Sequence, residues 1–161
     1  MPPRPSPKAK PPPRRAGEFP PHLSSGYLVR DAHRAFQRLL ERRIAAYGVS
    51  RGQWYFLRVL WITDGLSQRE LSARVGMMEP TTVIALRSME KSGLIRRVRG
   101  ADDRRVTRVH LTPKARRLRD RLLQISQGVN DQGAEGVDPA ALAQFRRVIA
   151  RMTENLDRIE R

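Results

Sequence analysis

The sequence of 161 residues contains no cysteine, and this absence excludes disulfide bonds, thiol-based redox sensing and metal sites built on thiolates. Its three histidines, His22, His33 and His110, lie far apart and lack the spacing of metal ligands. A phosphate-binding P-loop and a glycine-rich dinucleotide fingerprint are missing as well. We therefore expect no metal and no cofactor, and the sequence argues against an enzyme.

Long apolar runs are also missing, since no stretch approaches the roughly 18 consecutive apolar residues that a membrane-spanning helix needs. The N-terminus is basic but carries no apolar segment of the kind found in secretory signals. We therefore expect a cytoplasmic protein.

Positive charge, in contrast, is in excess. Lysine and arginine number 32 against 16 aspartates and glutamates, which gives a formal net charge of +16 and a pI near 11.6. Such a surplus favours a polyanionic partner, because neutralising phosphates releases their counterions. Nucleic acid is the favoured partner, and an anionic membrane surface is the alternative.

Proline is concentrated at the N-terminus, where residues 1–22 hold nine of the twelve prolines, interspersed with lysine and arginine. A segment of this composition cannot bury a core, so we expect it to be extended or disordered. It is either a solvated tail or a basic arm that adds contacts to DNA.

Helix signals follow. Apolar residues at helical spacing predict a helix over residues 28–47. Two capping-box sequences, Ser50 with Gln53 and Ser67 with Glu70, then mark the starts of two further helices.

The next helix begins near Pro80, because proline is tolerated in the first turn, and ends at Gly93. Its spacing turns Val83, Leu86 and Met89 toward the core.

The period then changes to that of β-strands. Two short segments rich in β-branched residues, 94–100 and 106–112, flank “ADDR” and predict a two-stranded hairpin. Thr112-Pro113 and Asp138-Pro139 predict the starts of two last helices, which a glycine-containing break at 128–136 separates.

The order helix, short helix, helix and hairpin is typical of a winged helix-turn-helix, with “VGMMEP” as the turn. Such a unit inserts the second helix of the pair into the major groove of DNA. The sequence therefore predicts a mainly α fold with a small β-hairpin wing (α+β).

Five segments resemble the MarR (multiple antibiotic resistance regulator) family of transcription factors in the order of that family. They are “GYLVRDAHRAFQRLLERRI”, “GVSRGQWYFLRVL”, “LSQRELSARVGM”, “TTVIALRSMEKSGLIRR” and “DDRRVTRVHLTPKA”, and together they cover residues 26 to about 115. The resemblance implies a homodimer that binds a pseudo-palindromic operator and is often released by a small ligand.

The resemblance also implies a division of the chain. Residues 1–22 form the tail, 23–48 an N-terminal dimerisation helix, 49–112 the winged helix-turn-helix DNA-binding region and 113–161 the C-terminal dimerisation helices. The apolar stripes of the terminal helices offer more surface than one small domain consumes, which independently favours a dimer.

The tip of the hairpin combines acids with arginines. Gly100 and Asp102 suit a tight turn, and a carboxylate at Asp103 can orient a neighbouring guanidinium through charge-assisted hydrogen bonds. We therefore assign Asp103, Arg104 and Arg105 to DNA binding, with an arginine aimed at the narrow minor groove. The alternative is that these opposite charges only offset one another.

The helix after Pro80 supplies the candidate groove-facing residues Thr81, Thr82, Ala85, Arg87, Ser88 and Lys91. Much of the MarR family carries a polar residue, often arginine, where this chain has Ile84 and Ala85, which leaves few side chains for bidentate base recognition. Ser67 and Gln68 should contact phosphate at the preceding helix start. For Ser67, helix capping is an equally good explanation.

A group of aromatic and basic residues is the candidate ligand-binding set: Tyr27, Arg30, His33, Arg51, Trp54, Tyr55 and Trp61. Aromatic walls with a few cations suit an anionic aromatic acid or its acyl-CoA thioester. The alternative is that the aromatic side chains are packed core.

The sequence thus predicts a sequence-specific DNA-binding regulator of the MarR type, a repressor that a small aromatic or acyl-CoA effector releases. The alternative is an architectural or non-specific nucleic-acid-binding protein without a ligand.

Overall fold

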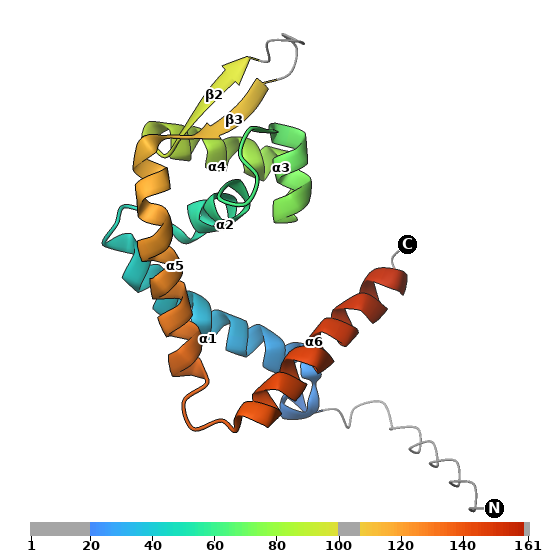
Figure 1. Cartoon of the computed structure of the whole chain (residues 1–161). Helices are drawn as coiled ribbons and strands as arrows, with labels where there is room; N and C mark the ends of the chain where they lie inside the picture. Colours follow the sequence, from blue (N-terminus) through green and yellow to red (C-terminus); the bar gives the residue numbers. More distant parts are fainter. Residues whose placement is uncertain (1–19, 100–106, 160–161) are drawn as a thin grey trace, which may run out of the picture. The chain divides into compact units, whose positions relative to one another are not determined.

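The computed structural model describes residues 20–99 and 107–159 (Figure 1). In chain order the elements are a 3-10 turn η1 (Pro21–Leu23), α1 (Ser25–Ala45), α2 (Arg51–Leu60), β1 (Leu66–Ser67), α3 (Gln68–Val75), α4 (Glu79–Lys91), β2 (Ile95–Arg99), β3 (Thr107–Leu111), α5 (Pro113–Gly133) and α6 (Pro139–Ile159). The chain divides between Ala35 and Phe36 into two compact units. The fold is mainly α with a small antiparallel sheet, as predicted.

Both predicted capping boxes are confirmed. At α2, Ser50 Oγ accepts from the Gln53 backbone N–H at 3.3 Å, and Gln53 Oε1 accepts from the Ser50 N–H at 3.0 Å. At α3, Ser67 Oγ accepts from the Glu70 N–H at 3.3 Å, and Glu70 Oε2 accepts from the Ser67 N–H at 2.8 Å. Each box satisfies two backbone donors that the helix itself leaves unpaired.

The other predicted starts are confirmed as well. Pro80 lies in the first turn of α4. Thr112 caps α5 by accepting from the Ala115 N–H, and Asp138 accepts from the Ala141 N–H at 2.8 Å where α6 begins.

The predicted break at 128–136 begins too early, because α5 continues through Gly128 to Gly133. A glycine inside a helix costs only about 1 kcal/mol relative to alanine. Packing outweighs that cost here, since Val129 is buried and Gln132 Oε1 accepts from Arg43 of α1 at 2.6 Å.

The predicted hairpin is present, and a third strand joins it. The strand order is β1-β3-β2, with Leu66 opposite Val109 and Ile95 opposite Leu111. The two residues of β1 are too few to show any alternation of polarity, so the sequence carried no sign of this strand.

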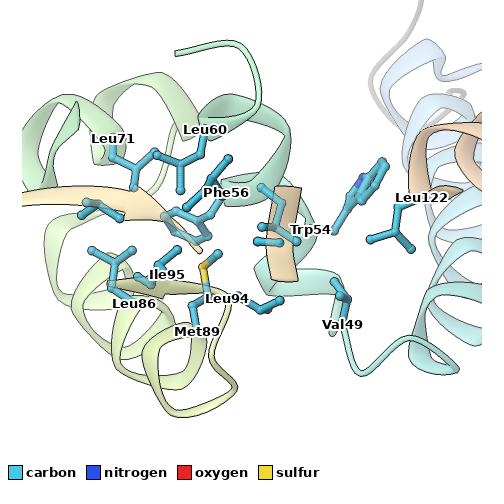
Figure 2. Packing of buried hydrophobic residues seen from close by; sticks show 14 of the residues in the cluster. Val49, Trp54, Phe56, Leu60, Leu71, Leu86, Met89, Leu94, Ile95 and Leu122 are labelled. Atoms are coloured by element: carbon cyan, nitrogen blue, oxygen red, sulfur yellow. The ribbon is translucent and has the colours of Figure 1, made fainter. Parts of the chain in front are cut away.

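One hydrophobic core joins α2, α3, α4 and the sheet, and it also includes residues of α1 and α5. Figure 2 shows the Phe56 ring among the side chains of Leu60, Leu71 and Leu86, each at most 1% exposed. Trp54 lies on the side of this core that faces Leu122 of α5. Because these elements share one core, the position of α4 is set by packing on its inner face.

Within residues 20–99 and 107–159, none of the helices combines the length and apolarity needed to cross a lipid bilayer.

Candidate nucleic-acid interface

The turn between α3 and α4 is held by a set of short-range hydrogen bonds. Gly76 adopts a left-handed conformation with φ 70° and ends α3. The N–H groups of Gly76 and Met77 both donate to the Ser72 carbonyl, at 3.0 and 3.1 Å, and the buried Ser72 hydroxyl donates to the Met77 carbonyl. These hydrogen bonds hold the turn in one conformation, which sets the direction in which α4 leaves it.

The inner face of α4 consists of Thr82, Leu86 and Met89, all buried. Thr82 is 0% exposed, and its hydroxyl donates to the Met78 carbonyl at 3.2 Å. The prediction that Thr82 faces a DNA groove is therefore wrong. The reason is helical period, because positions 82, 86 and 89 lie on one side of the helix. Ala85 is only partly buried and packs against the core.

The outer face of α4 is formed by Thr81, Ile84, Arg87, Ser88 and Lys91, all exposed. It carries two cations, two hydroxyls and one isoleucine. Of the two helices in the helix-turn-helix, α3 has 8 residues and α4 has 13. The outer face of α4 therefore continues over about three turns, which makes α4 the helix suited to insertion into a groove.

Gln53 links α2 to α4 in addition to its capping role. Its side-chain amide donates to the hydroxyls of Ser88 and Ser92, each at 3.1 Å. The sequence predicted only the capping contact, since the partners on α4 are brought close by folding. Ser88, which was predicted to face DNA, is exposed, and its hydroxyl also accepts this hydrogen bond from α2.

At the start of α3, the Ser67 hydroxyl is engaged in its capping box, while Gln68 is half-buried beside it. Hydrogen bonds from Ser67 are the main cause that lowers the pKa of Glu70, and the nearby Arg108 and Arg74 add to it. Helix capping by Ser67 is observed, and its contact with phosphate stays a prediction.

The strands of the wing carry arginines that are tied to the body. Arg97 on β2 donates through Nε and Nη2 to Glu90 Oε2 of α4, at 3.1 and 2.6 Å. These hydrogen bonds lower the pKa of Glu90. Arg108 on β3 donates to the Gly65 carbonyl at 3.0 Å. Two of the exposed wing arginines thus fix the hairpin against α4 and against Gly65, the residue before β1.

The base of the wing is anchored on Asp64. Its carboxylate accepts from the Leu111 backbone N–H at 2.9 Å, from the Arg116 guanidinium, and lies 3.6 Å from His110 Nδ1. Sequence reasoning missed this anchor, because “DG” at 64–65 signals a turn and says nothing of partners 46 to 52 residues away. The aspartate therefore couples the hairpin to α5.

The predicted tip of the wing, with Asp103, Arg104 and Arg105, lies outside the described residues.

Of the predicted ligand-binding residues, Trp54 is core, at 2% exposed. Its ring meets that of Trp61 edge-on, with centroids 5.8 Å apart, and Trp61 Nε1 donates to the Ala115 carbonyl at 3.0 Å. These contacts support the packed-core alternative for both tryptophans. Tyr55 is partly buried against the same core, and Arg51 is exposed.

Tyr27, Arg30 and His33 belong to the other compact unit, where they are exposed on α1. Arg30 Cζ lies 3.7 Å above the Tyr27 ring centroid, and its guanidinium pairs with Asp31 at 3.0 Å. Side-chain hydrogen bonding with Tyr27 and then with Asp31 raises the pKa of Arg30. This cation is therefore stacked and paired with neighbours on its own helix.

Residues 47–106 match a family model described as MarR family. The curated HTH-type transcriptional regulator TtmR of Methylorubrum extorquens (strain PA1) is 32% identical over 96 residues, 60% of this chain and 49% of that protein. The match thus spans about half the length of that relative.

Solved structures match over most of the chain. A MarR transcriptional regulator from Methanosarcina mazei Go1 is 28% identical with a TM-score of 0.76, over 83% of this chain and 96% of that one. The transcriptional regulator PA3341 is 34% identical with a TM-score of 0.71, over 83% and 98%. The transcriptional repressor CouR, solved with a 23-mer DNA duplex, has a TM-score of 0.75 at 22% identity over 82% and 94%, which shows the fold alone.

Proposed function

The chain belongs to the MarR family of transcriptional regulators, and on that premise we propose that it binds duplex DNA in a sequence-specific manner as a homodimer. Proteins of this family are regulators of transcription and not enzymes. The observation that carries the proposal is the outer face of α4, which is exposed over its length while the inner face is buried in the core. The major groove of B-DNA, about 12 Å wide, admits such a helix.

The charges around α4 support binding to phosphates. Arg87 and Lys91 lie on α4 itself, Arg69 and Arg74 on α3, and all four are exposed. In this proposal Thr81 and Arg87 face the groove, Lys91 contacts the backbone, and Gln68 contacts phosphate beside the start of α3. Phosphate contacts position the helix, and base contacts supply specificity.

A dimer is supported by α6, which has no buried residue in the single chain. Several of its apolar side chains remain open to solvent, with Phe145 55%, Leu156 61% and Ile159 80% exposed. Pairing of two chains through the terminal helices would cover this surface and set two copies of α4 about 10 base pairs apart, one turn of duplex.

We propose further that the protein is a repressor and that an anionic aromatic acid or its acyl-CoA thioester releases it from DNA. The support is the chemistry of two candidate residues one turn apart on α2, the exposed cation Arg51 and the partly buried Tyr55. Titration of such compounds, followed by tryptophan fluorescence and operator binding, tests this part. A panel that changes neither signal would leave Trp54, Tyr55 and Trp61 with their packing role alone.

Competition binding at fixed salt tests the DNA proposal itself. The full chain is equilibrated with a labelled duplex from its own upstream region, and unlabelled competitors are random duplex and RNA of equal length. Specific binding predicts that random duplex and RNA compete at least 1,000-fold less well, as is usual for specific sites. Equal competition by all three would instead establish the architectural, non-specific alternative.

The wing tip has its own test. Arg104→Ala or Arg105→Ala should weaken binding to all duplexes and make the slope of log K against log salt shallower by about 0.9 for each lost phosphate contact. Asp103→Ala should also weaken binding, although it removes a negative charge, because the arginine loses its orienting partner. Tighter binding by Asp103→Ala at every salt concentration would rule out the orienting role.

A further inference from the structure

One side chain on the outer face of α4 differs in chemistry from its neighbours. Ile84 is 69% exposed and lies at the middle of this face, one turn from Thr81 and one turn from Arg87 and Ser88. The apolar residues that α4 supplies to the core, Leu86 and Met89, are 0% exposed. Ile84 is therefore not part of the hydrophobic core.

An isoleucine at this position cannot donate or accept a hydrogen bond, so it cannot read the donor and acceptor pattern of a base edge. The only apolar group that the bases present in the major groove is the C5-methyl group of thymine. Contact between the two removes apolar surface of both from water, which is favourable, whereas a polar base edge against Ile84 loses its hydration without compensation.

We propose that Ile84 recognises the C5-methyl group of a thymine at the centre of each half-site, and so sets a preference for a T·A pair there. The inference rests on the proposed function, since it requires α4 to lie in the major groove. The flanking Thr81 and Arg87 would then contact the bases or phosphates on either side of that pair.

The expected size of the effect follows from the burial of one methyl group, which changes an equilibrium constant by about four-fold. The chain contains a matched control in Ile62, an isoleucine that is 85% exposed in the turn after α2 and not on α4. Because both isoleucines are exposed, truncating either one should leave the unfolding midpoint close to that of the unmodified protein.

The test uses the full chain and a duplex selected by it from a random-sequence library. Each thymine of the selected half-site is replaced in turn by deoxyuridine, which keeps the hydrogen-bonding groups of thymine and loses only the methyl group. We expect one position per half-site at which the replacement weakens binding about four-fold. Ile84→Ala should bind the thymine and uracil duplexes equally at that position, and Ile62→Ala should discriminate as the unmodified protein does.

Two results would overturn the inference while leaving the proposed function intact: sequence-specific binding with no sensitive thymine, or full discrimination retained by Ile84→Ala. If selection enriches no duplex over random sequence, the proposed function fails, and the role of Ile84 fails with it.

Discussion

At the scale of single residues, two glycines with left-handed backbone conformations have different surroundings. Gly65 has φ +76°, and a Cβ atom there would lie 2.9 Å from His110 Cε1, whereas Gly76 has φ +70° with nothing within 4 Å of such an atom. A side chain at either site must therefore adopt the unfavourable left-handed backbone conformation. Only at Gly65 does it also collide with a neighbouring side chain.

We predict that Gly76→Ala lowers the free energy of unfolding by about 1 kcal/mol, the cost of the left-handed conformation alone. Gly65→Ala should cost about 1 kcal/mol more, because His110 must shift away from its position near Asp64. Urea denaturation of the two variants measures both values. Equal losses would mean that His110 moves freely and does not help to hold the wing.

A second residue-scale prediction concerns pH. Hydrogen bonds from Arg97 lower the pKa of Glu90, so the folded protein binds a proton at this carboxylate less readily than the unfolded chain does. The contribution of the pair to stability is therefore present above the unfolded pKa of glutamate and is lost as pH falls through the lower folded value.

Glu90→Gln should accordingly destabilise the protein near neutral pH by about 0.5 kcal/mol, a small amount because the pair is partly exposed. The difference from the unmodified protein should shrink as the pH falls below about 4. Chemical denaturation across this pH range gives the curve. The control is Glu154→Gln, which breaks the looser exposed pair with Arg151 at 3.4 Å. If the stability difference between Glu90→Gln and the unmodified protein grew as the pH fell, the predicted direction of the pH dependence would be wrong.

At the scale of elements, the start of α3 combines a structural role with a proposed one. Ser67→Ala should lower the free energy of unfolding by about 1 kcal/mol, because the Glu70 N–H loses its acceptor. Ser67→Asp should restore that stability, since aspartate caps equally well. It should nevertheless weaken DNA binding, because the added carboxylate approaches the phosphates.

Ser50→Ala, at the equivalent box of α2, is the matched control, with a similar loss of stability and unchanged DNA affinity. Unfolding and duplex binding are measured on all three variants at one salt concentration. Unweakened DNA binding by Ser67→Asp would leave Ser67 as a helix cap only.

At the scale of the whole molecule, the exposed apolar face of α6 predicts that folding and assembly are linked. The unfolding temperature should rise with protein concentration, as it does for a dimer whose monomers are unstable. Leu156→Glu should shift the sedimentation profile to monomer, whereas Ile62→Glu, at a more exposed position outside the terminal helices, should not. A folded, stable monomer of the unmodified protein at micromolar concentration would contradict the proposed dimer.

The sequence by itself determined the features that depend on neighbouring residues. The capping boxes at Ser50 and Ser67, the proline in the first turn of α4 and the hairpin from β2 to β3 were all predictable, because caps, turns and periodicity act within a few positions. From their order the winged helix-turn-helix also followed.

Only the tertiary structure decided which side chains of α4 face outward and what holds the wing. Thr82 and Ile84 are two positions apart, and the polarity of the two side chains alone favours an exposed threonine and a buried isoleucine, the reverse of what the structure shows. Helical period defines the faces of α4, but the partners supplied by α2, α3 and the sheet select the face that is buried. The same holds for strand β1 and for the contacts of Asp64 with β3 and α5, since these join residues far apart in the chain.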